Sequence, residues 1–275
     1  MEIIIKNKKK FNKPLVLSLI GLIPIAILCS ILHFPFFIFF YLIGMVIVLA
    51  ILHYLKIQKP FKENVIPLVL KEYKPTLEFI PKLEVKDDYI DLIKTHKLIP
   101  SATTFNINDG IIDDINGYKV TSFDLHATHT QSNGKSSTTV TDFKGRFYDI
   151  EFDKLDCDFI IKEEILKRIP NGYSFLEFEH IEFNKAFNIY VTDEHEAFKV
   201  FTPSVIKKYY ELAGLDDFKT IVHYHKNHLY VYLYNSKNIF ENTDEDYKQS
   251  IINDYKEQYE DILKYIETFK YYKLD

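Results

Sequence analysis

Cysteine is scarce in this chain of 275 residues, and its two cysteines lie in very different surroundings. Cys29 belongs to a long apolar stretch, whereas Cys157 belongs to the polar part of the sequence. A disulfide between those two locations is not expected, which agrees with a reducing compartment such as the cytoplasm.

Motifs that mark common enzyme classes are also missing. The sequence has no G-x-S-x-G, H-E-x-x-H, C-x-x-C or G-x-G-x-x-G pattern. Gly134-Lys135-Ser136 resembles the end of a phosphate-binding loop, but His129 stands where the first glycine of that motif belongs. These patterns indicate no cofactor and do not favour a catalytic function.

Arginine occurs only twice, at Arg146 and Arg168. The chain holds 34 basic and 39 acidic residues, and five lysines and Glu2 precede residue 14. The part from residue 56 onward therefore carries 29 basic and 38 acidic residues, a net charge of −9. Because a negative domain repels phosphate backbones, no nucleic-acid partner is expected.

Charged residues are absent from residues 14–55, which form two apolar runs of 20 residues each, 14–33 and 36–55. A helix of that length spans about 30 Å, the thickness of a hydrocarbon core. Pro35 separates the runs, because it cannot continue a helix without losing a backbone hydrogen bond. A signal peptide is the competing interpretation, but a second apolar run follows where a mature polar domain would begin. The stretch predicts a two-helix transmembrane hairpin in a lipid bilayer.

Lysines flank both outer ends of this predicted hairpin. Residues 1–13 hold five, Lys56 and Lys59 follow the second run, and the connecting turn has none. This distribution predicts a multi-pass protein of the cell membrane, with both termini and the main domain on the cytoplasmic side.

Residues 56–100 are expected to form a helical connector. Within it, a short helix over 87–98 places Tyr89, Leu92, Ile93 and His96 on one face, and Pro100 follows its end.

Residues 101–242 are expected to form an α+β domain, because short β-branched and aromatic runs of period two alternate with helical segments. The dipeptides Asp109-Gly110, Asn116-Gly117 and Lys226-Asn227 predict tight turns between antiparallel strands. The strand that ends at Phe152 places Asp149 and Glu151 on a face expected to be solvated.

Residues 243–275 contain the clearest helix of the polar part. Its apolar positions recur every three or four residues from Tyr247 to Phe269, and acidic residues open it. This amphipathic helix is expected to pack on the domain or to pair with another copy of the chain, which would make a homo-oligomer.

A longer stretch of this domain resembles a known family. The residues that carry the resemblance are Phe143-Lys144-Gly145-Arg146-Phe147, Glu179, Phe183, Phe187, Tyr190, Asp193, Glu196-Ala197, Thr202-Pro203 and the hairpin that follows. They resemble the bacterial family of unknown function DUF3137, although residues 198–201 lack the Arg and Leu expected there. The resemblance implies membrane attachment and LemA-type membrane proteins as frequent genomic neighbours, and it implies no activity.

Three histidines in the last predicted hairpin suggest a metal site. His223, His225 and His228 form H-x-H-x-x-H, in which the first two share a strand face and the third lies across the turn. A polar, solvent-facing hairpin explains the same pattern.

Three carboxylates, Glu179, Asp193 and Glu196, are the candidates for an acid/base pair. Asp193 is equally suited to cap a helical turn, and Glu196 to pair with Lys199.

Two functions follow from these observations. The first is a membrane-anchored, cytoplasmic-facing interaction or scaffold module without catalytic activity. The alternative is a metal-dependent or acid/base enzyme that uses the histidine hairpin or the carboxylate cluster.

Overall fold

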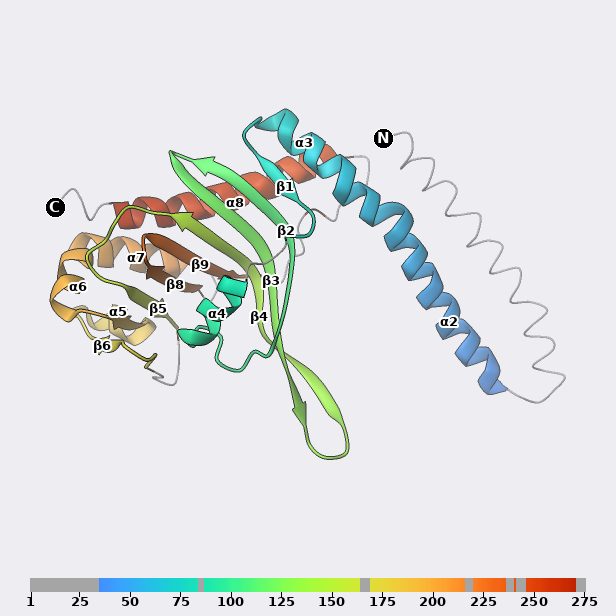
Figure 1. Ribbon diagram of the computed structural model, residues 1–275, viewed down its shortest axis with the longest axis horizontal. Helices are drawn as coiled ribbons and strands as arrows, with labels where there is room; N and C mark the ends of the chain where they lie inside the picture. Colours follow the sequence, from blue (N-terminus) through green and yellow to red (C-terminus); the bar gives the residue numbers. More distant parts are fainter. Residues whose placement is uncertain are drawn as a thin grey trace.

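The fold is described from a computed structural model, which covers residues 35–83, 87–163, 169–215, 220–235, 240 and 246–270. Within these residues the strands form one antiparallel sheet in the order β1-β2-β3-β4-β9-β8-β5-β7-β6 (Figure 1). The strands are β1 Glu78–Ile80, β2 Thr104–Ile115, β3 Tyr118–Ser132, β4 Ser137–Glu151, β5 Phe159–Lys162, β6 Ser174–Leu176, β7 Asn188–Val191, β8 Thr220–His225 and β9 His228–Tyr234.

Helices lie on both faces of the sheet and next to its β1 edge. They are α2 Pro35–His53, α3 Ile66–Tyr73, α4 Asp87–Thr95, α5 Ile181–Ala186, α6 Glu194–Val200, α7 Pro203–Leu215 and α8 Tyr247–Lys270. Two π-helical turns, Tyr54–Gln58 and Phe61–Val65, connect α2 to α3. In Figure 1, α2 projects away from the sheet, whereas α8 crosses it from the α3 side toward α7.

The central strands are buried on both faces, because alternate side chains enter two separate cores. On one face Phe147, Ile160 and Tyr232 pack with residues of and after α4, including Ile93. On the other face the core contains residues of α7 and α8 together with alternate strand residues, among them Tyr148, Phe159, Val222, Val231, Val205, Tyr209, Ile262 and Phe269. The apolar stripe of α8 is therefore buried within its own chain, which is the first of the two arrangements predicted for it.

Two of the three predicted tight turns are confirmed. Asn116-Gly117 joins β2 to β3 and Lys226-Asn227 joins β8 to β9, and all four residues have positive φ. The prediction for Asp109-Gly110 is wrong, because these residues form a bulge inside the continuous strand β2. β1 packs closely there, and a Cβ on Gly110 would lie 3.3 Å from the carbonyl oxygen of Ile80.

A buried carboxylate joins the connector, the sheet and the last helix. Asp113 of β2 lies 2.7 Å from Lys74 Nζ, and its Oδ2 accepts a 2.5 Å hydrogen bond from the hydroxyl of Tyr255 in α8. Only 2% of the Asp113 side chain is exposed. Burial and the neighbouring Asp113 raise the pKa of Tyr255, so its hydroxyl stays protonated and donates. This pairing satisfies a charge that would otherwise be costly to bury.

The predicted transmembrane hairpin is not supported by the structure. Its first run, 14–33, lies outside the described residues, and its second run, 36–55, falls on α2 and the π-helical turn after it. Across the described part of the chain, no helix is both long enough and apolar enough to cross a membrane. The remainder of the predicted fold class is confirmed, because the described residues form an antiparallel sheet with packed helices, an α+β fold.

We predict that Tyr255→Phe lowers the free energy of unfolding by about 1.5–3 kcal/mol, because buried Asp113 loses a hydrogen-bond donor. Urea unfolding of the full chain, followed by near-UV circular dichroism of the tyrosines, measures this change. Tyr259→Phe, one turn further along α8, is the matched control and should change stability by less than about 0.5 kcal/mol. Equal losses in the two variants would contradict the role given to Asp113.

Candidate functional site

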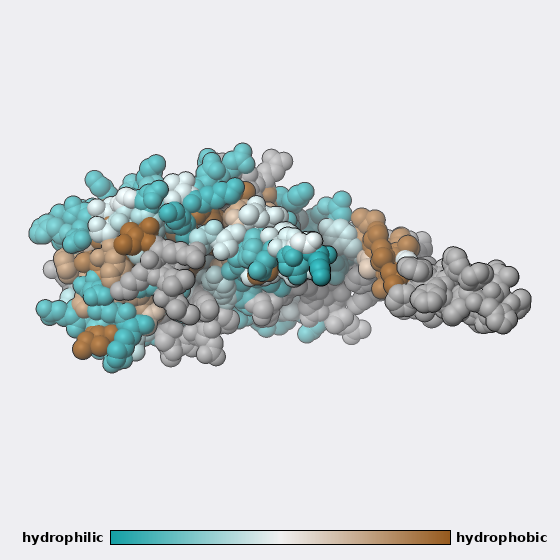
Figure 2. Space-filling model, turned by 90° about the horizontal axis from the view of Figure 1, so that it is seen from below, coloured by the Kyte–Doolittle hydropathy of each residue, from teal (hydrophilic) through white to brown (hydrophobic). Residues whose placement is uncertain are grey.

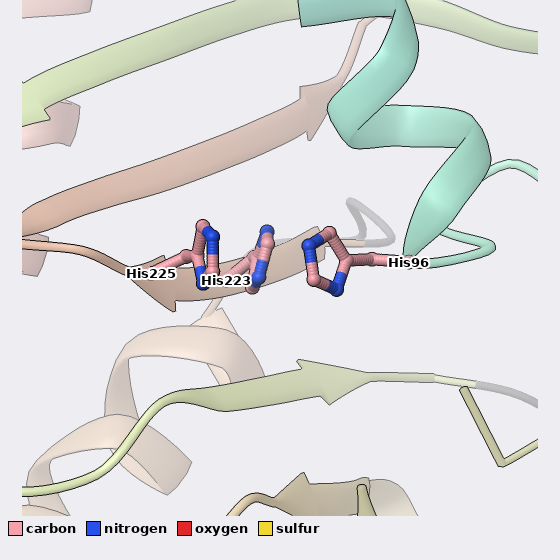
Figure 3. Close-up of side chains that lie close together, drawn as sticks. All are labelled: His96, His223 and His225. Carbon is pink, nitrogen blue, oxygen red and sulfur yellow. The ribbon is translucent and has the colours of Figure 1, made fainter. Parts of the chain in front are cut away.

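Three imidazoles from two distant segments meet on the α4 side of the sheet. His223 and His225 are two residues apart in β8 and therefore point to the same face. His96 follows the last residue of α4, and its backbone N–H donates to the carbonyl of Leu92 in a 3.1 Å hydrogen bond. Figure 3 shows the three side chains together, with His96 reaching from the end of α4 toward His223 and His225 on β8. The helix that covers this face thus delivers the third histidine.

The three rings are close enough to share a ligand. The ring centroid of His96 is 4.6 Å from that of His223 and 4.9 Å from that of His225. One potential ligand atom of each histidine lies within 4.8 Å of the other two. Among the described residues, no other group of three or more His, Cys, Asp or Glu side chains is arranged in this way.

Neighbouring side chains occupy one nitrogen on each of the two β8 histidines. His225 Nδ1 lies 2.5 Å from Asp158 Oδ2, and His223 Nε2 lies 3.3 Å from the hydroxyl of Tyr173. The Nδ1 atoms of His223 and His96 are buried and have no hydrogen-bond partner among the described residues. The cluster therefore holds two buried ring nitrogens whose hydrogen-bonding capacity is unused.

Burial favours the neutral form of His223 and His96, because it lowers the pKa of both imidazoles. It lowers the pKa of His223 well below the ordinary histidine value, and the adjacent His96 and His225 lower it further. Burial also lowers the pKa of His96, with His225 as the next cause. A neutral imidazole has a free lone pair on one ring nitrogen, and this neutral form is the one that binds a metal ion.

His228 is not a member of this cluster. It lies directly opposite His225 across the β8–β9 turn, but its Nδ1 is 2.6 Å from Asp149 Oδ1 in β4. Asp149 also accepts a 2.7 Å hydrogen bond from the hydroxyl of Tyr89 in α4. The structure therefore groups His223 and His225 with His96 and turns His228 toward Asp149. The expectation that Asp149 is solvated is wrong, because α4 covers it.

Two of the three predicted carboxylate candidates, Asp193 and Glu196, have local structural roles. Asp193 caps α6, where its Oδ1 accepts from the backbone N–H groups of His195 and Glu196 at 2.9 and 3.0 Å. Glu196 pairs with Lys199 at 2.7 Å, and Glu179 is exposed. These contacts account for Asp193 and Glu196 without a role in proton transfer.

A separate pocket of about 220 Å³ lies toward the opposite end of β8. Its lining residues include Asp142, Lys162, Thr220 and Tyr234. The ammonium group of Lys162 lies 5.2 Å from the centre of the Tyr190 ring, so this buried cation has an aromatic neighbour.

Sequence reasoning did not connect His96, Asp158 or Tyr173 with the histidine hairpin. A signal existed for His96, because the helical pattern places this polar residue on the apolar, inward face of its helix. Asp158 lies between β4 and β5 in a segment without periodicity, so its contact with His225, 67 positions away, has no local signature.

The sheet, its two helical layers and the histidine cluster define an α+β domain with a candidate metal-binding site. Residues 141–271 match the family model described as "Protein of unknown function (DUF3137)". This match confirms, for this part of the chain, the resemblance found in the sequence. The match includes His223 and His225, whereas His96 lies before its first residue.

Comparison with solved structures finds the crystal structure of the mycobacterial trehalose monomycolate transport factor A, TtfA. The two chains are 12% identical, the alignment covers 70% of this chain and 94% of the other, and the TM-score is 0.42. A TM-score this low does not establish a common fold. No curated protein matches the chain.

The His228–Asp149 pair predicts a pH-dependent stability. The hydrogen bond to Asp149 is the main cause that raises the pKa of His228. A histidine with a higher pKa in the folded state stabilises the fold below its unfolded pKa of about 6.5, and this contribution is lost as the pH rises through the folded value. His228→Gln should therefore cost more stability at about pH 5.5 than at about pH 8.5.

Urea unfolding of both proteins at the two pH values measures this difference. His126→Gln is the matched control, because its ring contacts the hydroxyl of Thr141 rather than a carboxylate. A loss in His228→Gln that is the same at both pH values would contradict the ion pair.

Proposed function

We propose that this chain is a membrane-anchored interaction or scaffold module whose α+β domain faces the cytoplasm. The observation that carries the proposal is the uncharged stretch 14–55, which is long enough for two spans and has lysines beyond both ends.

The exposed side chains of α2 and of the turn after it support this attachment. Of the twelve large hydrophobic residues that are exposed in the described part of the chain, seven lie here, and Val46 is exposed by 60%. They are Ile43, Val46, Ile47, Val48, Ile51, Tyr54 and Leu55. Figure 2 shows hydrophobic residues gathered in a band at one edge of the coloured surface, whereas the rest of that surface is largely hydrophilic. An apolar surface of this kind is stable only when covered, and hydrocarbon chains would cover it.

A projecting hairpin supports the interaction role. The outer parts of β3 and β4 extend beyond the rest of the sheet (Figure 1), and residues 130–139 are exposed. Beyond an irregularity at Ala127 and Thr128 the hairpin keeps its register out to Ser132 and Ser137, and Asn133 Oδ1 accepts from the backbone N–H of Ser136 at the tip. Ordering this arm costs conformational entropy without burying side chains in a core, which a binding role explains.

The proposed topology predicts which positions an impermeant thiol reagent reaches. In a Cys29→Ser/Cys157→Ala background, Ser136→Cys at the hairpin tip should be labelled only after cells are opened, because it faces the cytoplasm. Phe34→Cys, in the predicted turn between the spans, is the matched control and should be labelled in intact cells. Labelling of Ser136→Cys in intact cells would overturn the orientation.

The interaction role predicts a partner that depends on the arm. Purification of the detergent-solubilised full-length chain from its own cells should recover a membrane protein in stoichiometric amount, and a LemA-type protein is the first candidate. Replacing residues 130–139 by a short Asn-Gly turn should abolish the recovery. The Lys207→Ala/Glu211→Ala variant, altered on the exposed face of α7, should retain it. Substrate turnover that a folded point variant abolishes would overturn the scaffold proposal.

A further inference from the structure

We propose that His96, His223 and His225 bind one divalent transition-metal ion of the zinc class. This inference goes beyond the scaffold role and uses residues that the role does not require. It rests on the convergence of the three imidazoles, on their unused nitrogens, and on the side chains that orient them.

The convergence joins segments that are far apart in the sequence. α4 and β8 are separated by more than a hundred residues, yet each histidine offers a ligand atom within 4.8 Å of the other two. Tetrahedral zinc with Zn–N bonds of about 2.0–2.1 Å places its nitrogens about 3.3–3.4 Å apart. Side-chain rotations that move the nitrogens by roughly 1–1.5 Å therefore close the site around an ion, without rearrangement of the backbone.

The two buried Nδ1 atoms without hydrogen-bond partners indicate a ligand site rather than an ordinary packed core. His223 is fully buried, and its Nδ1 atom has no hydrogen-bond partner among the residues that the structure describes. The same holds for His96 Nδ1. A buried polar atom left without a partner costs about 1–3 kcal/mol, and coordination to a metal ion removes that cost.

The neighbouring side chains have the arrangement expected around metal-bound histidines. Asp158 holds His225 through Nδ1, and Tyr173 holds His223 through Nε2. Each contact fixes the ring orientation and leaves the opposite nitrogen for the ion. The carboxylate of Asp158 also adds a negative charge beside the site, which favours a cation.

The ligand set selects the class of metal. Three neutral imidazoles suit zinc and similar borderline ions, whereas calcium and magnesium require oxygen ligands. His96 and His225 are each partly exposed, so the cluster reaches the solvent at its edge, whereas His223 is buried. Three protein ligands leave one position of a tetrahedral ion open, so the ion can carry water or a further ligand.

The test uses the full-length, detergent-solubilised chain after removal of metals with a chelator. Equilibrium dialysis against Zn²⁺, with metal analysis, should show one high-affinity ion per chain. His96→Asn and His225→Asn should each weaken binding by at least about 100-fold, and Asp158→Asn by about 10–100-fold. Because His96 and His225 are only partly buried, these variants preserve the core better than a change at His223.

His228→Asn is the matched control, because it removes a histidine three residues from His225 that binds Asp149 instead. It should change zinc affinity by less than about threefold, and Zn²⁺ should raise the urea midpoint of this variant and the wild type but not of His96→Asn. Weak or absent zinc binding by the wild type would overturn the proposal. Equal affinity of the wild type and His96→Asn, with both folded by circular dichroism, would also overturn it. Membrane attachment is measured separately, so the two proposals fail independently.

Discussion

Burial of both faces of the central strands is the constraint on which this structure depends. β4, β9 and β8 carry large apolar or aromatic side chains at successive positions, so neither face can be left to water. α7 and α8 cover one face, and α4 with the segment after it covers the other. The site follows from this packing, because α4 ends above β8 and brings His96 against both His223 and His225.

Much of the domain could be predicted from local patterns, and the exceptions have physical reasons. Period-two runs and the Asn116-Gly117 and Lys226-Asn227 turns identify strands correctly, since positive φ at both turn residues suits a tight hairpin. Asp109 also has positive φ, but there the same backbone preference forms a bulge in β2 where that strand pairs with β1. The sheet order could not be predicted, because β4 pairs with β9 across about eighty residues and no turn signal spans that distance.

The candidate site was predictable only in part. Because His223 and His225 are two residues apart on one strand, the sequence predicts that their side chains lie on the same face. His228 lies opposite His225 and is expected on the same face, but its Nδ1 contacts Asp149 of β4 instead. The period of a strand does not reveal which side chains a neighbouring strand will supply. The reason for a glycine at position 145, within Phe143–Phe147, also lies far away in the sequence. A Cβ at this position would collide with the carbonyl of Leu233 in β9. The Arg146 guanidinium beside it bonds Asp124 and Ser122 of β3, which fits a structural element.

The buried Asp113 also defines a route for mechanical force. Lys74 lies just after the helical segment that leads from α2, and Tyr255 belongs to the last helix, so one carboxylate ties the start of the domain to its end. Because Asp113 belongs to β2, a pull on α2 that reaches Lys74 acts on the sheet and on α8 at the same point. The junction between α2 and the domain is thereby coupled to one of the two helices that cover this core.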